Sequence, residues 1–178
     1  MIKKGVYAAT LSVLDKNSTL NVKETITHAE NIINEGLHGV FFFGSTGQSQ
    51  LISMTEKKEL VSKLPLSKLK NNFFLGTGFN SLNDNLEFIK YSMEYEFNTF
   101  LIMPPAYYKG NTEEGVFEFY TKIIKNIPKV KIILYNFEKL SGFKFEPDFV
   151  KKLVSSYPKN IIGCKDSTYN LYEKIKIK

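Results

Sequence analysis

The sequence predicts an α/β fold built on a parallel sheet, and three observations support this prediction. Short apolar runs of β-strand character recur along the 178 residues, and an amphipathic helical pattern follows each run. Each strand with its helix takes about 30 residues, which is typical of a βαβ unit. No linker rich in Pro, Gly or Ser divides the chain, so we expect a single domain over residues 1–178.

The strands are predicted from six short runs, of which "GVFFF" and "KIILY" are the clearest. The expected strands are residues 5–10, 39–43, 72–77, 99–103, 131–135 and 161–165. Strands that alternate with helices in this way form a parallel sheet. This periodicity alone allows either an open doubly wound sheet or a closed (β/α)8 barrel, and both place ligands at the carboxyl ends of the strands.

Helical patterns occupy the intervals between the strands. The first spans residues 22–35, and its apolar face consists of Val22, Ile26, Ala29, Ile32 and Ile33. Gly36 is expected to end it. The later helices are expected to begin at a capping Ser53 or Thr55, at Ser81, after Thr112, at Pro147 in a first turn, and at Tyr169.

Charge and composition argue against a nucleic-acid partner. The net charge is +6, but all 24 basic residues are lysine, and arginine is the residue best suited to reading guanine and clamping phosphate. Pairs such as Lys57-Lys58 and Lys151-Lys152 have the spacing of solvated helix faces, so we expect them at the surface. The apolar runs are too short to cross a membrane, and no A-x-A site follows residues 1–16. We therefore expect a cytoplasmic protein without a membrane partner.

The sequence predicts neither a metal centre nor a cofactor. Cys164 is the single cysteine, which excludes an internal disulfide and a thiolate cluster. His28 and His38 are far apart and lack the spacing of metal ligands. The "GSTG" turn lacks the ending of a Walker motif, and "GTGF" at 76–79 lacks the third glycine of a dinucleotide-binding loop.

Polar residues at the predicted strand ends are the candidates for function. The turn Gly44-Ser45-Thr46-Gly47 offers two hydroxyls and backbone N–H groups, which suit a carboxylate. "PPAYYKG" follows the fourth strand, "YNFEKLSG" ends the fifth and Lys165 ends the sixth. Alternation along the sixth strand is expected to point Ile161, Gly163 and Lys165 to one face. Cys164 is then expected to face the helices and to be inert.

These residues together resemble the dihydrodipicolinate synthase and N-acetylneuraminate lyase family. The resemblance is carried, in order and spacing, by Gly44-Ser45-Thr46-Gly47, Tyr107-Tyr108, Tyr135-Asn136, Ser141-Gly142 and Gly163-x-Lys165-Asp166-Ser167. Members of this family are (β/α)8 barrels, usually tetramers, in which a lysine forms an imine with pyruvate or a pyruvate-derived product. The resemblance implies the same fold and chemistry here, with a 2-oxo acid as the small-molecule partner and a homo-oligomer as the assembly.

The resemblance also implies roles for single residues. Lys165 would form the imine, and Tyr135 would transfer protons as the general acid and base. Ser45, Thr46 and the Gly47 turn would bind the carboxylate, and Thr46 would connect to Tyr135 in a proton relay. Tyr108 would complete this relay from a neighbouring subunit. Burial at a strand end disfavours the ammonium form of a lysine and frees its amine to attack a ketone, which agrees with the role of Lys165.

Two departures from the family pattern affect the interpretation. The synthase branch carries an arginine where this chain has Leu140, and Glu138 replaces the usual proline. This favours an aldolase acting on a sugar acid such as N-acetylneuraminate or 2-keto-3-deoxygluconate, with dihydrodipicolinate synthase as the alternative. The sequence also contains six of the eight β/α units, whereas a full barrel needs about 250 residues. A catalytically silent relative and an unrelated doubly wound binding domain remain as further alternatives.

Overall fold

The computed structural model describes residues 2–169, whose contacts group them into two units. The first unit comprises the chain up to Gly78 together with residues 87–97, and the second comprises residues 79–86 and the chain from Asn98 onward. Each unit contains three consecutive strands that pair in parallel, so the predicted βα alternation is confirmed. The expected single domain over 1–178 stays a prediction.

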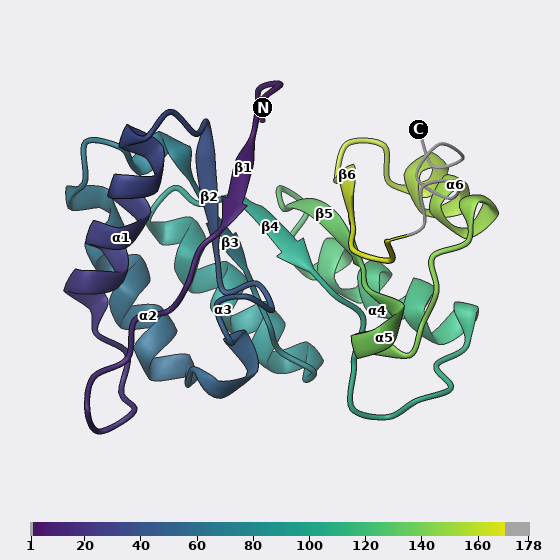
Figure 1. Ribbon diagram of the computed structural model, residues 1–178. Coiled ribbons are helices and arrows are strands. Elements are labelled where there is room, and N and C mark those ends of the chain that lie inside the picture. Colours follow the sequence, from purple (N-terminus) through teal and green to yellow (C-terminus); the bar gives the residue numbers. More distant parts are fainter. Residues whose placement is uncertain (1, 170–178) are drawn as a thin grey trace. The chain divides into compact units, whose positions relative to one another are not determined.

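The strands of the first unit are β1 (Tyr7–Ala9), β2 (Gly39–Phe42) and β3 (Phe73–Gly76). They pair in sequence order, with Val40 opposite both Ala8 and Phe73. Helix α1 (Val22–Asn34) packs against β2 and against α2 (Met54–Lys63), as Figure 1 shows. Three short 3-10 helices complete this part: η1 (Ser49–Leu51), η2 (Leu64–Leu66) and η3 (Lys70–Asn72).

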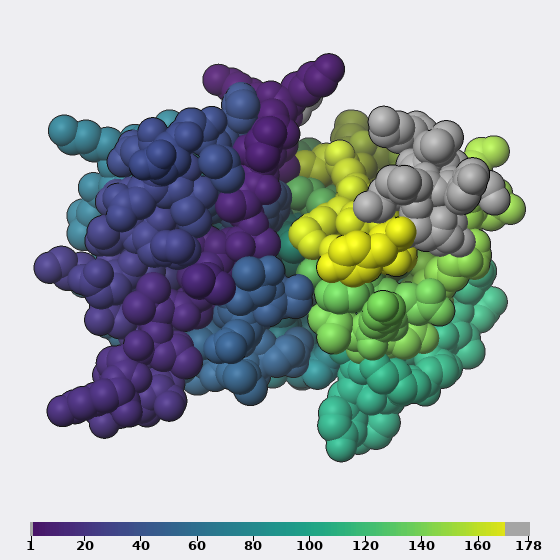
Figure 2. Space-filling view, viewed as in Figure 1, coloured from purple at the N-terminus to yellow at the C-terminus, as the bar shows by residue number. Residues whose placement is uncertain are grey.

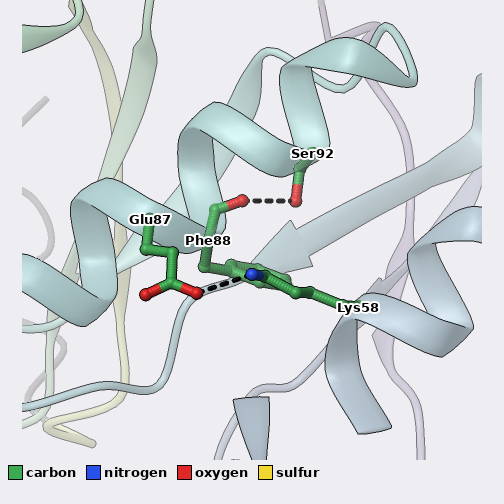
Figure 3. Close-up of polar contacts among 4 residues, drawn as sticks. All are labelled: Lys58, Glu87, Phe88 and Ser92. Atoms are coloured by element: carbon green, nitrogen blue, oxygen red, sulfur yellow. Dashed lines mark hydrogen bonds and ion pairs between the residues drawn. The ribbon is translucent and has the colours of Figure 1, made fainter. Parts of the chain in front are cut away.

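Helix α3 (Leu82–Glu94) contributes its residues from Glu87 onward to the first unit. An ion pair connects α3 to α2, as Figure 3 shows: Lys58 Nζ lies 2.6 Å from Glu87 Oε1, and both side chains are partly exposed. One turn farther along α3, Ser92 Oγ donates to the backbone oxygen of Phe88 at 2.8 Å. The hydroxyl of Ser92 is fully buried, and this bond satisfies it without a partner outside the helix.

Lys57 is buried, which corrects the prediction that Lys57 and Lys58 both lie on a solvated helix face. Its side chain is completely shielded, and Nζ donates to the backbone oxygen of Thr77 at 2.8 Å. Lys57 falls on the face of α2 that also carries Leu60 and Val61, three and four residues later, and these are buried too. The lysine therefore occupies a core position by helical periodicity, and its amine extends along that core to a carbonyl oxygen.

The strands of the second unit are β4 (Thr99–Ile102), β5 (Lys131–Asn136) and β6 (Ile161–Asp166). They also pair in sequence order, with Leu134 opposite Ile102 and Cys164. The helices are α4 (Glu113–Asn126), the short α5 (Glu138–Ser141) and α6 (Pro147–Ser156). The sequence did not predict α5.

The expected helix boundaries hold where the structure tests them. Ser53 caps α2 through a reciprocal pair of bonds with Glu56, Thr112 caps α4, and Pro147 occupies the first turn of α6. Gly36 follows α1 with a φ of 104°, which a side chain would oppose. The expected helix that begins at Tyr169 falls on residues 170–178, which lie outside the described part of the chain.

A β-bulge in β6 corrects the expected alternation of its side chains. Ile132 pairs with Ile161, whereas the next residue of β5, Ile133, pairs with Gly163, so Ile162 is the extra residue. Paired residues of neighbouring strands share a face of the sheet. Ile161 therefore shares the face of Cys164, and only Gly163 and Lys165 share the other face.

Candidate active site

Lys165 and Tyr135 form the centre of the candidate site in the second unit. The β5–β6 register places them directly opposite each other, near the carboxyl ends of both strands. Lys165 Nζ lies 4.1 Å from the centre of the Tyr135 ring, over its face. The electron-rich face of an aromatic ring attracts an ammonium group at this distance. The structure thus brings together two of the residues that the sequence predicted for catalysis.

The amine of Lys165 has a second contact that the sequence did not predict. Nζ donates to Ser167 Oγ at 2.7 Å, so the side chain turns back toward the loop that follows β6. Tyr135 is buried, with 5% of its surface exposed, whereas Lys165 is only half-buried. The end of β6 lies on the surface seen in Figure 2, among the yellow atoms. Lys165 is therefore the more exposed residue of the pair.

The Gly44–Gly47 turn follows β2 in the first unit and exposes both of its hydroxyl side chains. Ser45 and Thr46 are exposed, whereas Gly44 and Gly47 are buried. Hydrogen bonds hold the turn in shape: Gln48 N donates to Ser45 O at 3.0 Å, Ser49 N donates to Gly44 O at 3.3 Å, and Ser12 Oγ donates to Gly47 O at 2.6 Å.

Gly47 is required by close packing of this turn. A Cβ atom at position 47 would lie 2.9 Å from the backbone oxygen of Thr10, closer than such atoms approach in proteins. The residue that enters the turn, Phe43, has a φ of 59°, an uncommon conformation for a bulky side chain. The backbone therefore holds the two hydroxyls of the turn in a fixed place, which suits the binding of a small anion.

Tyr107 and Tyr108 protrude from the loop after β4. They are 77% and 79% exposed, and their rings meet edge to face with centres 5.1 Å apart. The loop is anchored by Asn80 Oδ1, which accepts from Ala106 N at 2.7 Å, and by Lys109, whose amine donates to the carbonyl oxygen of Leu140. The position of Tyr108 at a subunit contact stays a prediction.

Cys164 faces away from Lys165, as the sequence predicted. Burial raises the pKa of the Cys164 thiol from 9.0 to about 11, and the Asp166 carboxylate adds to this rise. Burial likewise raises the pKa of the Tyr120 phenol on α4, and the nearby Cys164 contributes to that rise. The thiol therefore packs toward α4 in its neutral form and is a poor nucleophile there.

Two expected absences can be examined only in residues 2–169. Within this range, His, Cys, Asp and Glu side chains nowhere gather in a group of three that could hold a metal ion. The same range contains no helix that is long and apolar enough to cross a membrane.

The family of the chain follows from comparison with known proteins. Residues 3–178 match the Dihydrodipicolinate synthetase family. The chain belongs to this family. It is 28% identical over 169 residues to a 4-hydroxy-tetrahydrodipicolinate synthase of Agrobacterium fabrum, covering 94% of this chain and 56% of that relative. It is also 28% identical over 178 residues to an L-threo-3-deoxy-hexylosonate aldolase of Aspergillus niger, covering 95% of this chain and 52% of that enzyme.

The fold agrees with that of solved members of the family. The crystal structure of dihydrodipicolinate synthase from Agrobacterium tumefaciens matches 98% of this chain and 62% of its own, with a TM-score of 0.92 and 21% sequence identity. The six strands and the helices between them, within residues 2–169, are therefore those of a (β/α)8-type barrel, as the sequence predicted. The chain spans little more than half the length of the two relatives described above.

Proposed function

We propose that Lys165 forms an imine with pyruvate or a pyruvate-derived 2-oxo acid, as part of a class I aldolase. The observation that carries this proposal is the placement of Lys165 Nζ 4.1 Å from the centre of the Tyr135 ring, at the carboxyl ends of two parallel strands. Ligands bind at this end of the strands in barrels of this type. A lysine and a tyrosine in contact there supply a nucleophile and a proton donor.

The proposed chemistry begins at the amine. The unprotonated Nζ attacks the carbonyl carbon of the 2-oxo acid, a C–N bond forms, and the oxygen leaves as water after it has been protonated. In a 2-keto sugar acid, the hydroxyl on C4 then loses its proton and the C3–C4 bond breaks. The electron pair of that bond passes to the protonated imine at C2, which gives an enamine, and C4 leaves as the aldehyde carbon. In the synthetic direction the enamine attacks the aldehyde instead. Tyr135 transfers the protons of these steps through its phenol.

We assign the Gly44–Gly47 turn to the carboxylate of the 2-oxo acid. The exposed hydroxyls of Ser45 and Thr46 and the N–H groups of a glycine-containing turn are donors of the kind that bind carboxylates. The carboxylate is adjacent to the reacting carbonyl in every 2-oxo acid. A bound carboxylate therefore restricts the orientations that the reacting carbonyl can adopt.

Leu140 favours a sugar acid over aspartate semialdehyde as the second substrate. Its side chain is apolar and 41% exposed, so it cannot bind the carboxylate of aspartate semialdehyde. A charge-assisted hydrogen bond of this kind contributes about 1.5–3 kcal/mol. The second candidate function is 4-hydroxy-tetrahydrodipicolinate synthase, the name carried by the relative in Agrobacterium fabrum. In a full-length protein, robust condensation of pyruvate with aspartate semialdehyde would decide for that candidate.

Trapping with borohydride tests the imine directly. Incubation with pyruvate and sodium cyanoborohydride should convert Lys165 Nζ to a secondary amine that carries one carboxyethyl group, detected by peptide mass spectrometry. Lys165→Ala should remove this product, and Tyr135→Phe should slow its formation without moving it to another residue. Lys122→Ala, at an exposed position on α4, is the matched control and should label as the unaltered protein does.

The distribution of the label decides between an activated lysine and a silent relative. The 24 lysines of the chain compete for the same reagent. Preferential labelling at Lys165 supports the proposal. Label spread evenly over the lysines means that Lys165 is not activated in this chain, and the proposed function is then wrong.

A further inference from the structure

Asn136 and Asp166 are paired across the sheet immediately beyond Tyr135 and Lys165. The β5–β6 register places Asn136 opposite Asp166, just as it places Tyr135 opposite Lys165. Asn136 Nδ2 donates to Asp166 Oδ2 at 2.8 Å. The side chain of Asn136 is completely buried and Asp166 is half-buried, so this bond is partly shielded from water. A shielded bond to a carboxylate is stronger than the same bond at the surface.

The other end of the Asn136 amide is also engaged. Asn136 Oδ1 accepts from the backbone N–H of Phe145 at 3.4 Å. Phe145 is buried, and its ring packs against Phe143 and Phe149. The amide therefore connects the end of β5 to the aromatic cluster of the second unit on one side and to β6 on the other. Its orientation is fixed from both ends.

Asp166 shapes the turn that follows β6. Its Oδ1 atom accepts from both Thr168 N at 3.0 Å and Thr168 Oγ1 at 2.8 Å. Within this turn, Ser167 N donates to the backbone oxygen of Asn136 at 2.9 Å. The turn thereby presents Ser167 Oγ to Lys165 Nζ, which donates to it at 2.7 Å.

We propose that Asn136 and Asp166 are a positioning pair that holds the amine of Lys165 over the Tyr135 ring. The pair acts through Ser167, whose hydroxyl accepts a hydrogen bond from the Lys165 amine, and through the β5–β6 register, which sets Tyr135 opposite Lys165. This proposal rests on the proposed function for its catalytic consequence, since a displacement of about 1 Å at a reacting group can lower a rate on the order of a hundredfold. Its geometric content can be tested without any reaction.

The geometry is tested by NMR of the protein labelled with 13C at the lysine ε carbon. The ring current of Tyr135 should shift the ε-methylene protons of Lys165 upfield, and Lys165→Ala assigns this signal by removing it. Asn136→Asp places two carboxylates opposite each other. Asp166→Asn places an amide N–H₂ group where the neighbouring groups also donate hydrogen bonds. Each single variant should move the Lys165 signal toward the position of solvated lysines. The exchanged pair N136D/D166N restores one amide and one carboxylate, and should restore the signal.

The unaltered protein, the two single variants and the exchanged pair then report the catalytic consequence of the proposal. After trapping with pyruvate and cyanoborohydride, the label on Lys165 should fall by about tenfold or more in each single variant. The exchanged pair should carry nearly as much label as the unaltered protein. Absence of label in the unaltered protein would contradict the proposed function but would leave the NMR test intact. An upfield signal that persists in both single variants, or that the exchanged pair fails to restore, overturns the positioning pair.

An internal reference guards against variants that unfold. Lys152 Nζ lies 4.9 Å from the centre of the Phe117 ring, between α6 and α4, so its ε-methylene signal reports the fold of the same unit. This signal should stay unchanged in every variant. Ser167→Ala removes only the hydroxyl that receives the Lys165 amine and leaves Asn136 and Asp166 in place. If the Lys165 signal stays upfield in Ser167→Ala, the amine is not held through Ser167 and the proposal is wrong.

Discussion

Gly78→Ala should destabilise the first unit more than its half-buried position in the loop after β3 suggests. Gly78 has a φ of 66°, and a Cβ atom there would lie 1.6 Å from Ser49 Oγ and 2.5 Å from Ser49 Cβ. Rotation of the Ser49 side chain can move the Oγ atom but not the Cβ atom, so relief of the clash requires a backbone shift. Such overpacking costs about 1–3 kcal/mol, and the left-handed backbone costs roughly 1–2 kcal/mol more.

Gly36→Ala separates these two contributions. Gly36 has a φ of 104° and no atom within 4 Å of its Cβ position, so alanine there meets the backbone cost alone. Its φ lies farther from the left-handed minimum near 57° than that of Gly78, so its backbone cost is at least as large. The loss of unfolded-state entropy is common to both substitutions and cancels. The difference between the two variants is therefore a lower limit on the clash, which costs about 1–3 kcal/mol.

Urea denaturation followed by circular dichroism measures this difference, provided that the dependence on urea is the same in all variants. Ser49→Gly removes the two atoms that the new Cβ atom would meet most closely and leaves only Lys57 Nζ, at 3.1 Å. The double variant S49G/G78A should therefore be more stable than the sum of the single effects predicts, by about the size of the clash. Additive effects in the double variant would refute the packing argument.

Two further predictions concern the cap of α2 and the thiol of β6. Ser53→Ala should cost about 1 kcal/mol in urea denaturation. A hydrogen bond from the Ser53 hydroxyl is the main cause that lowers the Glu56 pKa below 4.5, so Ser53→Ala should raise that pKa in an NMR titration. A lowered carboxyl pKa stabilises the fold above the unfolded value, and this stabilisation is lost as pH falls through the folded pKa. The variant should therefore reduce this stabilisation. Cys164 should resist iodoacetamide at pH 8 until urea unfolds the chain, because burial raises its pKa to about 11. Its contribution to stability should be complete below pH 9 and be lost as pH rises through 11, and Cys164→Ala should flatten this alkaline loss.

The fold could be predicted because its signals are local. Each strand is a continuous apolar run, and Ser53, Thr112 and Pro147 mark helix starts by their own side-chain chemistry. The prediction for Lys57 is wrong because it rests on the residue type, and lysine usually lies at the surface. The spacing of Lys57 to Leu60 and Val61 indicates the core instead. Helical spacing could have revealed this.

The candidate site was only partly predictable, for a different physical reason. Lys165 and Tyr135 could be predicted because their positions at strand ends follow from the strand pattern. Ser167 and the Asn136–Asp166 pair depend on which residues of β5 and β6 lie opposite each other. That register depends on the bulge at Ile162, and the only signal for it in "IIGCK" is Gly163, since a glycine inside a strand pattern suggests a bulge without fixing its position. A register cannot be read from one strand alone.

The bulge at Ile162 decides whether an amine or a thiol is delivered to the Tyr135 side of the sheet. Without a bulge, the same residues would pair one for one with β5, and Cys164 rather than Lys165 would lie opposite Tyr135. The bulge absorbs one residue, so a strand that lacked Ile162 would form a regular ladder and would still set Lys165 opposite Tyr135. A residue inserted between Gly163 and Cys164, beyond the bulge, would instead turn the amine toward α4 and bring the sulfur atom to the ring. The position of the bulge therefore determines which side chain reaches the ring.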